Sequence, residues 1–105
     1  MKVKIPREIK IAGHWFAIGY EEGLASRHHK YGFVSTDTLV IHVEPTIPDS
    51  LKSQTLLHEL VHTLSDQFIC ANAFSEEVVG QIATGIWVML SDLGIEFDWS
   101  EIKEE

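Results

Sequence analysis

The spacing of apolar positions changes about midway along the chain. Over about residues 1–45, apolar and polar residues alternate, and β-branched and aromatic residues are frequent, notably in segments 8–12, 14–20 and 38–43. A period of two residues is typical of strands that bury one face. The polar segment 21–32 interrupts this pattern and is predicted to form an exposed loop. We therefore expect the first part of the chain to form a small antiparallel sheet.

The first predicted helix occupies about residues 50–70. Its apolar residues recur at helical spacing, and Pro45 and Pro48 separate it from the sheet. Either Asp49 or Ser50 is expected to cap its N-terminus, because short polar side chains accept hydrogen bonds from the free N–H groups there.

A second predicted helix follows at about residues 75–93. Ser75 is a typical N-cap, and Gly94 is a typical C-terminal stop. Its inward face is expected to carry Val79, Ile82, Ala83, Ile86, Leu90 and Leu93. The tail, 95–105, is expected to place its aromatic residues on the core and then to fray. A sheet followed by two packed helices makes the predicted fold an α+β domain, and the whole chain, 1–105, is expected to be one domain.

The charge balance narrows the classes of partner. The chain has eight Lys and Arg residues against sixteen Asp and Glu residues, for a formal net charge of -8. Nucleic acids and anionic membranes require a concentrated positive surface, so neither is expected as a partner. Cys70 is the single cysteine, which excludes an internal disulfide and a cysteine-based metal site. Without an apolar N-terminal segment of signal-peptide length, a cytoplasmic location is expected.

The motif His58-Glu59-Leu60-Val61-His62 lies within the first predicted helix. Residues four apart share one helix face, so the two imidazoles can bind one ion, whereas Glu59 points roughly 100° away around the axis. This pattern is typical of zinc hydrolases in which two His residues hold the metal and Glu is the general base. With the His and Glu content of this chain, roughly 0.03 copies of the His-Glu-x-x-His motif are expected by chance. The alternative interpretation is a polar stripe that binds no metal.

A catalytic zinc normally has three protein ligands and a water, so a third ligand must come from another element. Glu76 and Glu77 at the start of the second helix are the candidates. The helical phase favours Glu76, because it extends the apolar stripe, whereas Glu77 aligns with a more polar flank. Both acids can also be ordinary N-terminal helix residues that interact with the dipole. Asp66, one turn after His62, is expected either to accept a hydrogen bond from a zinc-bound imidazole or to be solvated.

These residues resemble the gluzincin arrangement, because thirteen residues separate His62 from Glu76. The compact form is similar to minimal gluzincins and to small metallopeptidase-like proteins of phages and bacteria, and more distantly to the peptidase domain of the ImmA/IrrE type. The resemblance covers about Thr55 to Asp92. It implies a zincin-like core in which a sheet precedes the catalytic helix and a second helix brings the glutamate ligand. Larger gluzincins often carry an aspartate four residues after that glutamate, where this chain has Gly80.

The predicted function is zinc-dependent hydrolysis of a peptide or protein substrate, with one zinc ion held by His58, His62 and Glu76 and with Glu59 as general base. The alternatives are a metal-binding regulatory or interaction module with little activity, and a metal-free fold. The candidate donors for stabilising the oxyanion are Tyr31, His14, His28, His29 and His42. The strand at 38–43 is expected to hold the substrate by main-chain pairing.

Overall fold

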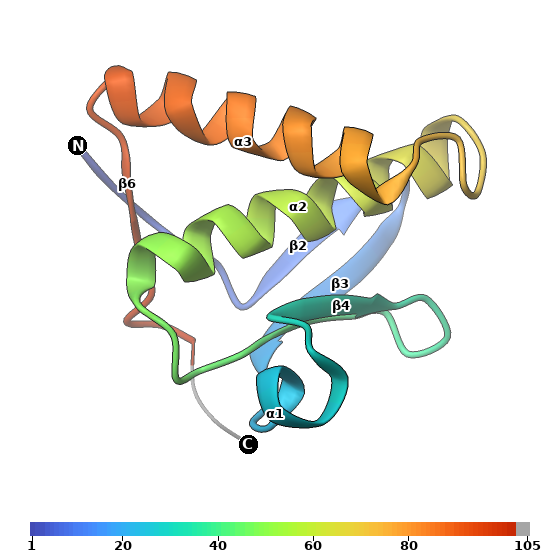
Figure 1. Ribbon diagram of the computed structural model, residues 1–105, viewed down its shortest axis with the longest axis horizontal. Coiled ribbons are helices and arrows are strands. Elements are labelled where there is room, and N and C mark those ends of the chain that lie inside the picture. Colours follow the sequence, from blue (N-terminus) through green and yellow to red (C-terminus); the bar gives the residue numbers. More distant parts are fainter. Residues whose placement is uncertain (103–105) are drawn as a thin grey trace.

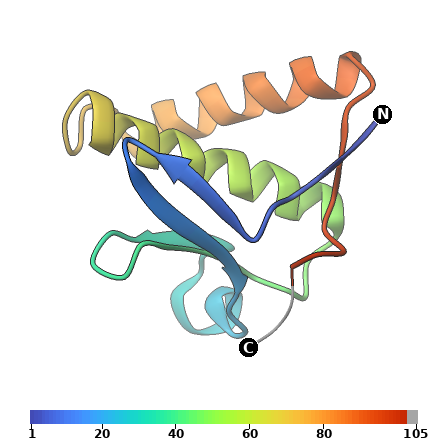
Figure 2. The ribbon, with the colours of Figure 1, turned by 180° about the vertical axis from the view of Figure 1, so that it is seen from behind.

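Two long helices are stacked on one face of a four-stranded sheet in the computed structural model, which describes residues 1–102 (Figure 1). The helix α2 lies between the sheet and α3, and α3 runs back along α2 in the opposite direction (Figures 1 and 2). The predicted α+β domain with a small sheet and two packed helices is confirmed at this level. In chain order the elements are β1 (Lys2–Lys4), β2 (Glu8–Ile11), β3 (His14–Tyr20), α1 (Leu24–His28), β4 (Gly32–Ser35), β5 (Val40–Val43), α2 (Asp49–Phe68), α3 (Glu76–Asp92) and β6 (Glu96–Asp98).

The sheet is mixed, so the prediction of an antiparallel sheet was wrong in part. Its strand order is β2-β3-β5-β4, with β3 and β5 parallel and the two outer pairs antiparallel. The difference arises in the segment predicted as a loop. That segment contains the short helix α1 and leads into β4, which forms a hairpin with β5 and leaves β5 in the middle of the sheet. The chain therefore enters β5 in the same direction as β3.

A two-residue turn fixes the register of the first hairpin. Ala12 and Gly13 connect β2 to β3 and both have positive φ, at 51° and 85°. This backbone is that of a type I′ turn, whose twist matches the twist of the flanking strands. The turn places Ile9 opposite Phe16, and Phe16 is fully buried.

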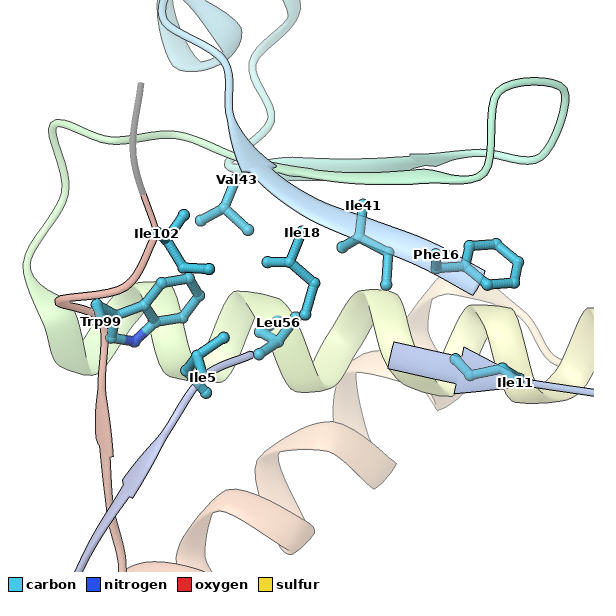
Figure 3. Close-up of a cluster of buried hydrophobic side chains, with 9 residues drawn as sticks. All are labelled: Ile5, Ile11, Phe16, Ile18, Ile41, Val43, Leu56, Trp99 and Ile102. Carbon is cyan, nitrogen blue, oxygen red and sulfur yellow. The ribbon is translucent and has the colours of Figure 1, made fainter. Parts of the chain in front are cut away.

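The main core lies between the sheet and α2 (Figure 3). It contains apolar residues from both ends of the chain: Ile5, Ile11, Phe16, Ile18, Ile41, Val43, Leu56, Trp99 and Ile102. Trp99 also satisfies its indole N–H, which donates to Ser53 Oγ at 3.0 Å. The expectation that the tail contributes an aromatic residue to the core is confirmed for Trp99. Residues 103–105 of the predicted tail lie outside the described residues.

A smaller cluster joins α2 to α3. Leu57 and Val61 of α2 pack against Val79 and Ala83 of α3. Two residues that were predicted to face inward are exposed instead, Ile82 and Leu93. The α3 sequence is apolar around most of its circumference, so its spacing does not define one inward face.

The helix ends confirm two of the predicted signals and contradict a third. Ser75 Oγ accepts a hydrogen bond from Val78 N at 3.2 Å and so caps α3. Gly94, with φ of 78°, follows the end of α3 as predicted. By contrast, neither Asp49 nor Ser50 caps α2, because the helix already begins at Asp49. The Asp49 carboxylate pairs with Lys52 Nζ at 3.3 Å instead.

Within residues 1–102, no helix has both the length and the apolar character that crossing a membrane requires.

Candidate metal centre

His58 and His62 occupy successive turns of α2, on the side that faces α3. Their ring centroids are 4.9 Å apart, with an angle of 65° between the ring planes. Both side chains are partly buried, with 24% and 31% of their surface exposed. The helical spacing therefore gives the two neighbouring imidazoles that the sequence predicts.

Glu76, the first residue of α3, contacts both imidazoles through its carboxylate. Its Oε1 lies 2.5 Å from His58 Nε2 and its Oε2 lies 2.9 Å from His62 Nε2. The three residues each offer a ligand atom within 4.8 Å of the other two. Glu77 is exposed on the neighbouring side of the helix and is not a member of this group. The structure thus brings Glu76, rather than Glu77, to the two histidines.

The end of α3 that carries Glu76 is fixed by its cap and by small residues in the seam between the helices. Ser75 caps the first turn, which sets the position of the glutamate that follows it. One turn later, Gly80 lies beside His58, and a Cβ built on Gly80 would be 3.8 Å from His58 Cε1 and 3.9 Å from Nδ1. The absence of a side chain at Gly80 leaves room next to the ring nitrogen that does not face Glu76.

Glu59 lies next to His58 in sequence but is turned toward the sheet, and only 7% of its surface is exposed. The strand β4 passes close to it at Gly32. A Cβ on Gly32 would be 2.7 Å from Thr55 Cγ2 and 3.3 Å from Glu59 Cγ. Glycine at this position is therefore required for the close approach of β4 to α2. The result is a carboxylate held between a helix and a strand, beside the two imidazoles.

The two carboxylates of the site have pKa values shifted in opposite directions. Burial raises the pKa of Glu59 above its usual value, although the charges of His58 and His62 partly offset this effect. Burial also acts to raise the pKa of Glu76, but its hydrogen bond with His58 and the charges of the two histidines outweigh burial and lower it. Such a separation is typical of sites in which one carboxylate exchanges a proton and the other stays ionised.

Two cavities meet at the site. One, of about 690 Å³, is lined by the segment from His29 to Phe33 on one side and by residues of α2 and α3 on the other. A second, of about 490 Å³, lies toward Asp66 and Ser75. Both cavities are lined by Glu59, His62 and Glu76. These three residues therefore lie between the two cavities.

The predicted donors for an oxyanion divide into two groups. Tyr31 and His29 line the larger cavity, whereas His14, His28 and His42 do not. His42 is occupied elsewhere, stacked on Phe33 with a centroid distance of 4.3 Å and paired with Glu21 through Nδ1 at 3.4 Å.

Asp66, the predicted partner of a zinc-bound imidazole, is exposed at the rim of the smaller cavity. It has no hydrogen bond or ion pair with His62, whose Nε2 contacts Glu76. The structure therefore places Asp66 near the site without connecting it to the histidines.

The strand predicted to hold substrate was assigned wrongly. Segment 38–43 contains β5, which is paired on both sides and cannot accept another strand. The free edge next to the site belongs to β4, which was not predicted. Glu44 N donates to Tyr31 O at 2.8 Å, and hydrogen-bonded and non-bonded pairs alternate in an antiparallel ladder. The N–H and C=O groups of Gly32 and Val34 therefore point away from β5, toward the open edge.

Sequence reasoning also missed the buried carboxylate of Glu44, of which 1% is exposed. Oε1 accepts from Ala25 N at 3.1 Å, and Oε2 accepts from Thr46 Oγ1 at 3.2 Å. Burial acts to raise the pKa of Glu44, but these hydrogen bonds outweigh it and lower the pKa. Glu44 therefore fixes α1 to the end of β5. Its one signal in the sequence is an acidic residue directly after an apolar strand.

The chain was compared with protein-family models, curated proteins and solved structures, and none of the three comparisons found a match. The interpretation of the site depends on the donor atoms described above: two imidazole nitrogens and a carboxylate oxygen.

Proposed function

We propose that His58, His62 and Glu76 hold one zinc ion and that the protein is a peptidase with a minimal zincin-like core. Zinc–ligand bonds are about 2.0–2.2 Å long, so the ligand atoms of a tetrahedral site are separated by about 3.4 Å. Three donor atoms within 4.8 Å of one another are compatible with that spacing after small side-chain rotations. Two nitrogens and one oxygen also form a donor set that is typical of catalytic zinc. This convergence is the observation that carries the proposal.

When bound, zinc supplies a Lewis acid that activates water for attack and polarises the carbonyl group of the substrate. Glu59 performs the proton transfers. Its carboxylate accepts a proton from the attacking water as the carbon–oxygen bond forms, and it donates that proton to the amide nitrogen as the carbon–nitrogen bond breaks. The raised pKa of Glu59, which results chiefly from its burial, suits a group that takes up and then releases a proton.

The open edge of β4 supports an extended peptide as the substrate. Gly32 lines the larger cavity and Val34 lines the smaller one, so this edge follows both cavities past Glu59. Main-chain pairing with the free N–H and C=O groups would hold a peptide in an extended conformation. The bond to be cleaved would then lie at the residues that both cavities share.

The test of the metal site is a competition titration with a chromophoric zinc chelator. We expect wild-type protein to bind one zinc ion per chain. Glu76→Ala should lower the affinity by at least about 100-fold, because even the loss of a hydrogen-bond partner of a ligand costs about 10- to 100-fold. Glu77→Ala is the matched control and should bind as wild type does. Equal affinities for wild type and Glu76→Ala would refute the proposed site.

A second candidate function is a metal-binding interaction module, which the surface of α3 favours. Several large apolar residues near its C-terminal end are exposed: Val88, Met89 and Leu93. Exposed apolar groups of this kind often mark surfaces for protein contacts. The two functions are separated by Glu59→Gln, which should lower hydrolysis by about 10²- to 10⁴-fold but leave binding to a protein partner intact.

A further inference from the structure

One wall of the larger cavity is basic, although the chain as a whole is acidic. Segment 27–30 reads Arg-His-His-Lys in a chain with eight basic and sixteen acidic residues. From this segment, His29 and Lys30 line the larger cavity. The smaller cavity on the other side of Glu59 contains Asp66 among its lining residues. The two ends of the site therefore differ in charge.

The basic wall is fixed to the body of the protein. Leu24, at the start of α1, is fully buried, and its carbonyl oxygen accepts hydrogen bonds from the backbone N–H groups of His29 and Lys30. Also in the first turn of α1, the Glu44 carboxylate accepts from Ala25 N at 3.1 Å. A backbone held at several points places Lys30 in a defined position at the cavity.

Of the two cations in this segment, Lys30 is the one that can meet a ligand. The guanidinium of Arg27 donates to the backbone oxygens of Glu22 and Gly23, at 2.7 and 3.4 Å. Arg27 also lies outside the cavity lining. Lys30, in contrast, lines the cavity, and within residues 1–102 its ammonium forms no salt bridge. The charge of Lys30 acts on the Glu59 carboxylate at longer range without forming an ion pair with it. A carboxylate that enters this end of the site would therefore find an exposed ammonium that no close acidic group neutralises.

We propose that Lys30 makes the site selective for peptides that carry a carboxylate on the α1 side of the bond to be cleaved. This proposal depends on the proposed peptidase function for its meaning, but the binding step can be measured alone. The carboxylate can be an acidic side chain or the free C-terminus of the peptide, and both would pair with the same ammonium. Asp66 at the other end would repel a carboxylate, so the selectivity should be one-sided.

Binding can be measured by fluorescence anisotropy with zinc-loaded Glu59→Gln protein, which should not consume the peptide. The probes are labelled heptapeptides of neutral residues with an amidated C-terminus, in which one glutamate or one glutamine is moved through the central positions. A third, neutral peptide has a free C-terminal carboxylate. We expect glutamate to bind about fivefold more tightly than glutamine at positions on one side only, as is typical of a partly exposed ion pair. Tighter binding of the third peptide than of its amidated form would identify the C-terminus as the favoured carboxylate.

Variants of Lys30 separate a specific contact from a general effect of charge. In the same Glu59→Gln background, Lys30→Gln should remove the preference for glutamate, and Lys30→Glu should reverse it. Lys10→Glu makes the same change of net charge on β2, at the opposite edge of the sheet, and should keep the preference. The preference should also decrease at high salt, because exposed ion pairs are screened.

The two proposals fail in different ways. If wild-type protein hydrolyses peptides but the glutamate and glutamine peptides bind equally, the role of Lys30 is refuted and the peptidase function stands. The same conclusion follows if Lys30→Gln weakens both peptides equally. If no hydrolysis occurs but the one-sided preference is present and depends on Lys30, the binding role stands and the peptidase function is refuted.

Discussion

The two faces of α2 are packed very differently. Toward the sheet, Leu56 belongs to a core of nine buried residues that draws on the sheet, the chain start and the tail. Toward α3, only four residues are buried, and the partly buried Ile86, Trp87, Leu90 and Phe97 pack against them. Glu59 lies on the sheet side, whereas the proposed ligands His58, His62 and Glu76 lie at the contact between α2 and α3.

This difference suggests that the two faces of α2 contribute to the site in different ways. The sheet side provides a rigid support, so it can hold a buried acidic side chain beside the site. The contact between α2 and α3 contains fewer buried residues than the sheet side. An ion held by residues of both helices would therefore contribute to the attachment of α3. Metal binding is therefore expected to stabilise the α2–α3 contact more than the sheet.

The largest effect is expected on catalysis when the acid on the sheet side is changed. Glu59→Gln should lower peptide hydrolysis by about 10²- to 10⁴-fold, the usual contribution of a general acid–base group. Zinc content, measured by elemental analysis, should stay at one ion per chain, because Glu59 is not a ligand in this site. Glu77→Gln is the control for the lost charge. Loss of zinc from Glu59→Gln would show that Glu59 also helps to hold the metal and would contradict its assignment to catalysis alone.

Core substitutions on the two faces should differ in their effect on stability. Val43→Ala in the sheet core should destabilise the metal-free protein by about 2–3 kcal/mol, because the surrounding core leaves a cavity. Val79→Ala at the contact between α2 and α3 deletes the same two methyl groups and should cost about 1–2 kcal/mol. Urea denaturation in the presence of a chelator measures both values. Equal costs would show that the two faces of α2 are packed equally firmly.

Gly80 offers a way to strengthen the seam side of the site. An aspartate at this position would lie next to His58 Nδ1, where an ideal Cβ finds ordinary van der Waals distances. A carboxylate that accepts a hydrogen bond from a metal-bound imidazole typically raises metal affinity by about tenfold or more. Gly80→Asp should therefore bind zinc more tightly in the competition titration. Gly85→Asp makes the same change on α3 where no atom lies within 4 Å of the Cβ, and it should leave the affinity unchanged.

The smallest effect concerns the pH dependence of stability in metal-free protein. Because burial raises the pKa of Glu59, the folded state binds this proton more tightly than the unfolded state does. Ionisation of Glu59 therefore reduces stability as the pH rises above the ordinary value of 4.5. Glu59→Gln should raise Tm near pH 7, by up to about 4–8 °C for a gain on the order of 1 kcal/mol. The gain should vanish below about pH 4. A gain that is largest in acid would contradict the raised pKa.

The sequence predicted the parts of the molecule whose signals are local. The two helices, the cap at Ser75 and the stop at Gly94 follow from residue preferences within one or two turns. The proximity of His58 and His62 follows from helix geometry alone. The sequence favours Glu76 over Glu77 because Glu76 lies on the same helix face as Val79 and the other apolar residues of the predicted inward stripe. The structure places Glu76 against both histidines.

The parts that the sequence did not predict depend on pairing between distant segments. The helix α1 and the strand β4 have five and four residues, too few for a clear period. The segment that contains α1 and β4 connects β3 to β5. Its course decides that β3 and β5 are parallel and that β4 forms the free edge of the sheet. The exposure of Ile82 and Leu93 was missed because α3 is apolar on nearly all sides.

The most direct test of the metal centre is a crystal structure of zinc-loaded protein with anomalous diffraction data collected on both sides of the zinc edge. A single anomalous peak is expected within about 2.0–2.2 Å of His58 Nε2, His62 Nε2 and a carboxylate oxygen of Glu76. A peak elsewhere, or none in protein that contains one zinc per chain, would contradict the proposed centre.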